Sequence, residues 1–134
     1  MIDHQAALIY AMVMSSAADS DMTDSELARI GEIVSHLPVF ATFDIERLPE
    51  ITADCAELLA DDDGLDKAFE AMRGALPDRL RETAYALACD VVAADGSAAQ
   101  EELRLLEILR HALDIDRLNA AAIERGAAAR YAVP

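Results

Sequence analysis

The chain has 134 residues, of which 54% are apolar and only 4% aromatic, with no tryptophan. Its formal charge of −15 excludes binding to the phosphate backbone of nucleic acids and to anionic membrane surfaces. A chain of this length can fold around one core, and a core of Ala, Leu, Ile, Val and Met is typical of close-packed helices. We therefore expect a single all-α domain over residues 1–134, with cations or basic protein surfaces as partners.

The longest apolar segment near the N-terminus, residues 6–18, is too short to cross a bilayer, which requires about 20 apolar residues in a helix. No lysine or arginine precedes this segment, as one would in a secretory signal peptide. We therefore expect a cytoplasmic protein that does not insert directly into membranes.

Two helices joined by an acidic turn are predicted for residues 2–37. The first spans Ile2–Ala18 and is apolar over most of its surface, which predicts a central position in the fold. Thr23 is followed three residues later by Glu26, which matches a capping box at the start of the second helix. The buried stripe of the second helix is expected to be Leu27, Ile30, Val34 and Leu37, ending before Pro38.

The middle of the chain holds a connector and two further predicted helices. Residues 38–47 form the connector, whose two phenylalanines are expected to reach the core. The helices that follow are Leu48–Ala60, with a proline tolerated in its first turn, and Leu65–Leu76.

Three contiguous aspartates, residues 61–63, precede Gly64 between these two helices. Such a run suggests a metal-binding loop, but the alternating ligands of an EF-hand are absent. We interpret it as a solvated turn.

A fifth helix is predicted over Asp78–Ala94, and its second half is apolar on nearly all sides. Asp90 interrupts that apolar surface, and a carboxylate in a buried helix is costly unless it is paired or bound. Asp90 therefore either belongs to a functional site or forms a local hydrogen bond or faces solvent.

Two helices are expected in the last third of the chain. One spans Ala99–Ala112, and the other begins at Asp114 or Asp116 and fades through the alanine-rich segment after Gly126. The final residues show no recognisable anchor.

The two cysteines, Cys55 and Cys89, stand alone in apolar, helix-like surroundings. Because neither a CxxC pair nor a Cys/His cluster is present, zinc binding is not indicated, and we interpret both as small core side chains. His36 and His111 fall in the last turns of predicted helices, where an imidazole interacts favourably with the helix dipole, so catalysis is the less favoured interpretation.

The acidic turns after the first and fifth helices resemble each other at an offset of 76 residues. This offset aligns Asp19 with Asp95 and Glu26 with Glu102, and it keeps the apolar stripe of the next helix in register. Such a pattern predicts two copies of one helical hairpin inside a single compact bundle of about seven helices. The first and fifth helices should then pack together and bring the two acidic turns to the same end.

Two interpretations of the paired turns are open. The carboxylates of Asp19, Glu26, Asp95 and Glu102 could converge on a hard divalent cation, for which calcium, magnesium and manganese are the candidates of an all-oxygen site. Alternatively, each acidic side chain caps the following helix, and Gly96 is the left-handed residue that ends the fifth helix.

The sequence Ala94-Asp95-Gly96 with Glu102, and its degenerate copy Ala18-Asp19-Ser20 with Glu26, resembles the TerB-like family of tellurite-resistance proteins. This resemblance implies an all-helical bundle of about seven helices with an internal pseudo-repeat, and metal binding by the acidic residues of the two turns. It also implies a role in tellurite or stress response beside a protein partner, for which a membrane transporter of the same system is a candidate.

The preferred hypothesis is a non-enzymatic helical module that binds a divalent cation and a protein partner. One alternative is a metal-free acidic adaptor that docks a basic protein. A carboxylate-bridged metalloenzyme is less favoured, because such sites use Glu-x-x-His pairs on facing helices and no glutamate here is followed by histidine at that spacing.

Overall fold

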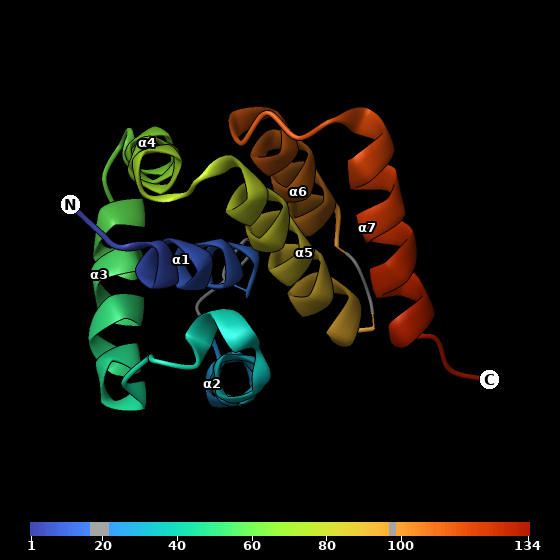
Figure 1. Ribbon diagram of the computed structural model, residues 1–134, viewed down its shortest axis with the longest axis horizontal. Helices are drawn as coiled ribbons and strands as arrows, with labels where there is room; N and C mark the ends of the chain where they lie inside the picture. The colour runs from blue at the N-terminus through green and yellow to red at the C-terminus, as the bar shows by residue number, and fades with distance from the viewer. Residues whose placement is uncertain (17–21, 97–98) are drawn as a thin grey trace.

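Helix α1 (His4–Ser16) lies at the centre of the protein in a computed structural model that describes residues 1–16, 22–96 and 99–134. Every residue from Gln5 to Ser16 is buried, because α1 contacts α2, α3, α4, α5 and α6. Figure 1 shows α1 bordered by α2, α3, α4 and α5, with α7 on the far side of α5. The central position predicted from its all-round apolar surface is confirmed.

Seven α-helices and no strand occur in the described part of the chain, which confirms the all-α class. Two short 3-10 helices, η1 (Pro38–Phe40) and η2 (Ile45–Arg47), occupy the predicted connector. The remaining helices are α2 (Asp24–His36), α3 (Leu48–Leu59), α4 (Gly64–Ala75), α5 (Asp78–Ala94), α6 (Gln100–Ala112) and α7 (Arg117–Arg130).

Local sequence signals set most of these boundaries. Thr23 and Glu26 form the predicted capping box: the Glu26 N–H donates to Thr23 Oγ1 at 3.2 Å, and the Thr23 N–H donates to Glu26 Oε1 at 2.8 Å. Pro77 precedes α5, where its missing N–H and fixed φ suit a helix start. At the other end of α5, Gly96 has φ +81°, the left-handed conformation that ends many helices.

The core is organised around the packing of α1 against α5, as the repeat predicted. Leu8 and Met12 of α1 are fully buried, and the residues 76 positions later, Ala84 and Ala88 of α5, are fully buried too. At these two positions the first copy supplies the large side chain and the second copy the small one, which allows the two helices to approach closely there.

The last helix departs from expectation, because α7 continues past Gly126 to Arg130 instead of fading. Alanine has the highest helix propensity, and Ala127 is buried in the core. Arg130 forms an ion pair with Asp90 of α5, which anchors the final turn. The sequence-based interpretation of an unanchored end was wrong because this contact joins residues 40 positions apart.

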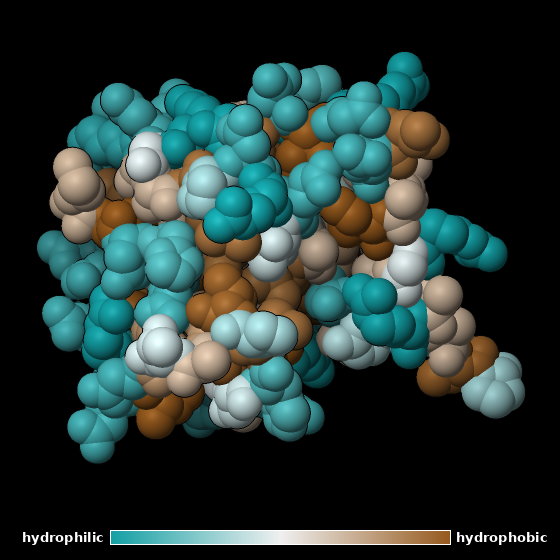
Figure 2. All heavy atoms as spheres, viewed as in Figure 1, coloured by the Kyte–Doolittle hydropathy of each residue, from teal (hydrophilic) through white to brown (hydrophobic). Residues whose placement is uncertain are grey.

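None of the helices in the described residues is both long enough and apolar enough for a membrane span. Figure 2 shows one face of the molecule, where polar side chains cover most of the surface and apolar side chains are visible between them near the middle.

Candidate functional site

The acidic turns lie where α1 and α5 end and where α2 and α6 begin. Asp19 falls outside the described residues, so its predicted position beside Asp95 stays a prediction. Asp95 is exposed and forms the C-cap of α5, immediately before the left-handed Gly96. A carboxylate at a helix C-terminus is disfavoured by the helix dipole, which a nearby cation would offset.

Glu26 lies in the first turn of α2 and is partly buried. Its Oε1 accepts the Thr23 N–H, and this bond satisfies one of the amides left without a partner at a helix start. Capping occupies one carboxylate oxygen and leaves the second oxygen for another ligand. The capping interpretation is therefore confirmed for Glu26, and it is compatible with metal binding.

Glu102 lies at the equivalent position of α6 but is much more deeply buried, with only 5% of its surface exposed. Its Oε1 accepts the Ala99 N–H at 3.0 Å. Ala99 is the N-cap residue and has no side-chain oxygen, so it cannot return the second hydrogen bond that Thr23 makes in the first copy. A carboxylate this deeply buried requires hydrogen bonds or positive charge to offset its lost hydration.

Within the described residues, no three His, Cys, Asp or Glu side chains come together in a metal-binding arrangement. Because Asp19 is not among those residues, the four-carboxylate site is not tested and stays a prediction. Glu26, Asp95 and Glu102 are all placed at the ends of helices that flank the two turns.

Ser16 provides an observation that fits an oxygen-lined site. It is the last residue of α1, immediately before the first acidic turn, and is 2% exposed. Its Oγ has no hydrogen-bond partner in the part of the chain that the structure describes. A buried hydroxyl without a partner is uncommon, and an oxygen donor of this kind suits calcium, magnesium or manganese.

The aspartate run at residues 61–63 behaves as the predicted solvated turn. Asp63 and Asp61 lie 3.1 and 3.5 Å from Lys67 Nζ, and all three side chains are about half exposed or more. The hydrogen bond with Lys67 lowers the pKa of Asp63. The turn is therefore neutralised in part by a lysine of α4 rather than arranged around a metal ion.

Asp90 also finds a partner within the protein, the guanidinium of Arg130. Its side chain is 19% exposed, and the pair connects α5 to α7. The sequence-based alternatives for Asp90 did not include this partner, which lies 40 residues away; the ion pair explains how α5 accommodates a carboxylate on a largely buried helix.

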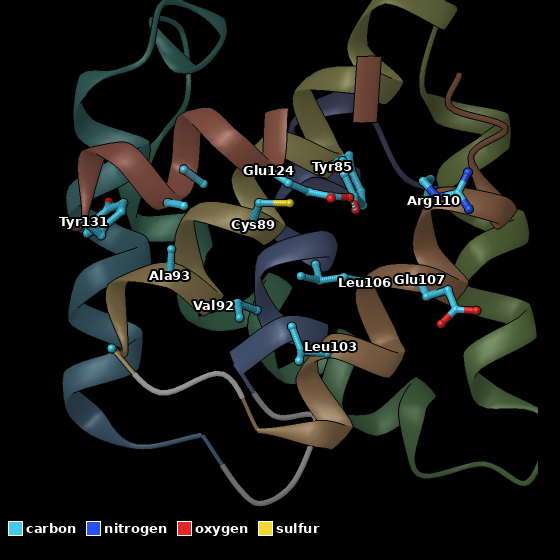
Figure 3. A pocket seen from close by; sticks show the side chains of 13 residues that line it. Tyr85, Cys89, Val92, Ala93, Leu103, Leu106, Glu107, Arg110, Glu124 and Tyr131 are labelled. Carbon is cyan, nitrogen blue, oxygen red and sulfur yellow. Dashed lines mark hydrogen bonds between the residues drawn. The ribbon is translucent and has the colours of Figure 1, made fainter. Parts of the chain in front are cut away.

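A groove outside the predicted site opens between α6 and α7 and has a volume of about 510 Å³. Figure 3 shows Tyr85 and Cys89 of α5 in this groove, together with Glu124 of α7. The Tyr85 hydroxyl donates to Glu124 Oε2 at 2.5 Å. Burial, followed by this hydrogen bond, raises the pKa of Tyr85.

Burial raises the pKa of Cys89 to about 12. The thiol is therefore protonated at neutral pH, and it lacks the thiolate character of a catalytic nucleophile. Cys55 is buried in the same way, and burial raises its pKa to about 12. Both cysteines are core side chains, as the sequence predicted.

Sequence reasoning missed the Tyr85–Glu124 bond and the Asp90–Arg130 pair. Both connect α5 to α7 across about forty residues. Hydrophobic periodicity predicts which face of each helix is buried, but it does not predict which polar side chains meet once two helices pack.

Comparison with protein families gives one match, to the model described as tellurite resistance protein TerB, over residues 5–125. The matched segment begins in the first turn of α1 and ends within α7, so it includes both acidic turns. Comparisons with curated proteins and with solved structures gave no match. Because the match covers nearly the whole chain, the protein belongs to the TerB family of tellurite-resistance proteins.

Proposed function

We propose that this TerB-family protein is a non-enzymatic module that holds a divalent cation at its two acidic turns, through Asp19, Glu26, Asp95 and Glu102. The cation is calcium, magnesium or manganese, because the ligands are oxygen atoms. The module acts in the cytoplasm in a stress response, together with a protein partner for which a membrane transporter of the same system is a candidate.

The burial of Glu102 is the observation that carries this proposal. The residue is only 5% exposed in a protein of charge −15, and it lies in the first turn of the helix that follows Asp95, which is exposed at the C-terminus of α5. In the proposed site, the carboxylates would repel one another. A divalent cation bound between them would offset that repulsion. The buried hydroxyl of Ser16 supports an additional oxygen donor at the first turn.

A metal-free adaptor is the second candidate, and it is favoured by the concentration of acidic side chains in one part of the chain. Residues 44–70, which include α3 and the start of α4, contain ten acidic and only two basic side chains. Such a surface would attract a basic partner by long-range electrostatics without requiring a metal.

Metal titration followed by thermal unfolding tests the proposal against the adaptor. A ligand at 100 times its dissociation constant stabilises the folded state by ~2.7 kcal/mol, which corresponds to a rise of several degrees in the melting temperature. We expect calcium, magnesium or manganese to produce such a saturable rise in the wild-type protein.

The decisive variant is Asp95→Asn combined with Glu102→Gln, which removes two charges. The glutamine amide oxygen can still accept the Ala99 N–H, so α6 keeps its cap. The matched control is Asp62→Asn with Glu70→Gln, which removes two exposed charges elsewhere. A metal-induced rise that is lost only in the first variant supports the site. An equal rise in all three proteins would mean nonspecific screening and would favour the adaptor.

A further inference from the structure

The groove between α6 and α7, called here the α6–α7 groove, is lined by one face of each of three helices. Leu103, Leu106 and Arg110 of α6 line one wall at helical spacing, and Ala127 and Tyr131 lie on the α7 wall. The floor is α5, from Tyr85 to Gly96. Residues spaced by three, four and seven positions share a helix face. Each of the three helices therefore presents one face to the groove (Figure 3).

The groove is open because α6 and α7 pack on α5 rather than closely on each other. Figure 1 shows them side by side and joined at one end by the loop after α6. Each wall carries a large apolar side chain that solvent reaches: Leu103 is 48% exposed and Tyr131 is 41% exposed. Contiguous apolar surface of this kind marks a binding site more often than isolated exposed residues do.

The dimensions suit a helix. Each wall extends over about seven residues, which is about 10 Å or two helical turns. Ala93, Ala127 and Ala128 contribute small side chains to the floor and one wall, so a fourth helix could approach the backbone closely. A helix placed there would complete four-helix packing with α5, α6 and α7.

The charged side chains that line the groove indicate which residues a bound helix would carry. Glu107 is paired with Arg104 at 3.3 Å, whereas the Arg110 guanidinium contacts the His111 ring and forms no ion pair among the described residues. Glu124 accepts a hydrogen bond from the Tyr85 hydroxyl, and no cation in the described part of the chain forms an ion pair with its carboxylate. A basic residue at the edge of a guest helix would complement that charge.

We infer that the α6–α7 groove binds an amphipathic helix of a partner protein, with leucine-like residues on one stripe and a lysine or arginine beside them that pairs with Glu124. This inference rests on the proposed function only in requiring a protein partner, and it is independent of the metal site.

The probe is a fluorescein-labelled peptide of about 14 residues, because shorter helices are marginally stable in water. It contains leucines at i, i+3, i+4 and i+7, alanines elsewhere and one lysine beside the stripe; a second peptide carries norleucine in place of lysine. Fluorescence anisotropy measures binding to the full chain. We expect saturable binding, tighter for the lysine peptide.

Two variants obstruct the groove from opposite walls. Ala128→Phe fills it from an exposed position on α7, and Leu103→Glu places a charge on the α6 wall. Each should weaken binding at least tenfold. The matched control is Ala122→Phe, which adds the same ring at an exposed α7 position outside the groove and should leave affinity unchanged. Circular dichroism establishes that each variant folds.

Glu124→Gln removes the negative charge at this position but keeps the shape of the side chain. It should weaken binding of the lysine peptide a few fold and leave the norleucine peptide unaffected. Absence of saturable binding, or equal binding by Ala128→Phe and Ala122→Phe, would overturn the inference. Reversible self-association of the wild-type protein that Ala128→Phe abolishes would identify a second copy as the occupant, and would also overturn it.

Peptide and metal titrations of the wild-type protein separate this inference from the metal proposal. Peptide binding without a metal-induced rise in the melting temperature of the wild-type protein would overturn only the metal proposal. A metal-induced rise without peptide binding would do the reverse.

Discussion

The two helical hairpins, α1–α2 and α5–α6, share an offset of 76 residues but occupy different environments. In the first hairpin, α1 is buried on all sides, whereas the glutamate that caps α2 is partly exposed. In the second hairpin, α5 carries polar residues that contact α7, whereas the glutamate that caps α6 is buried. The repeat therefore preserves the boundaries of α2 and α6 and the glutamate that caps each of them, while burial depends on which elements surround each copy.

The largest expected difference between the hairpins lies in their central helices. Met12→Ala removes a fully buried side chain from α1 and should lower the free energy of unfolding by about 2–5 kcal/mol, since the surrounding helices cannot fully close the cavity. The equivalent residue of α5 is already alanine, so Ala88→Leu tests the opposite change and should cost about 1–3 kcal/mol through overpacking.

Urea unfolding at neutral pH measures both changes. A cost below about 1 kcal/mol for Met12→Ala would contradict the central role of α1, because it would mean that the core relaxes freely around the lost side chain.

The second difference concerns Cys89, which occupies the position equivalent to Val13 of α1. Burial raises the pKa of Cys89 and of Cys55 from 9.0 to about 12 in the folded protein. The unfolded chain therefore loses these protons first as the pH rises, so stability is retained below pH 9 and falls above it. At pH 9.5 each thiol should lower the free energy of unfolding by about 1 kcal/mol.

Replacing both thiols, by Cys55→Val and Cys89→Val, should remove most of this loss. Urea unfolding at pH 7.5 and pH 9.5 gives the difference for each protein. If the double variant loses as much stability as the wild type between these two pH values, other groups cause the effect.

The two hairpins also differ in which of their features could be predicted from the sequence. The boundaries of α5 were predicted because proline and Asp-Gly are local signals, and the central position of α1 followed from its apolar surface. The different burial of Glu26 and Glu102 was not predictable, since it depends on packing between distant helices. The same reason applies to the ion pair of Asp90 and to the α6–α7 groove. The site formed by all four acidic residues stays a prediction.

The third difference is in helix capping. Thr23 accepts the Glu26 N–H in the first hairpin, so Thr23→Ala should cost about 1 kcal/mol. Ala99 occupies the corresponding N-cap of α6 with φ −69° and ψ 156°, a conformation in which threonine can cap. Ala99→Thr should therefore stabilise the protein by about 0.5 kcal/mol. Thermal and urea unfolding measure both, and a destabilising Ala99→Thr would show that the side chain at this position has no room to reach the amide.

The smallest expected effect concerns Asp90, which stands where the first hairpin has Met14 and forms an ion pair with Arg130. Asp90→Asn removes the charge but keeps the shape, and Arg130 is 56% exposed, so the overall cost should be only about 0.5 kcal/mol. The local effect should be larger, because this pair anchors the end of α7. Amide hydrogen exchange should therefore become faster in the last turn of α7, while α6 is unchanged. Arg130→Gln should produce the same local pattern, since it removes the other partner. Unchanged exchange at the end of α7 in both variants would mean that the burial of Ala127, and not the ion pair, holds this helix against α5.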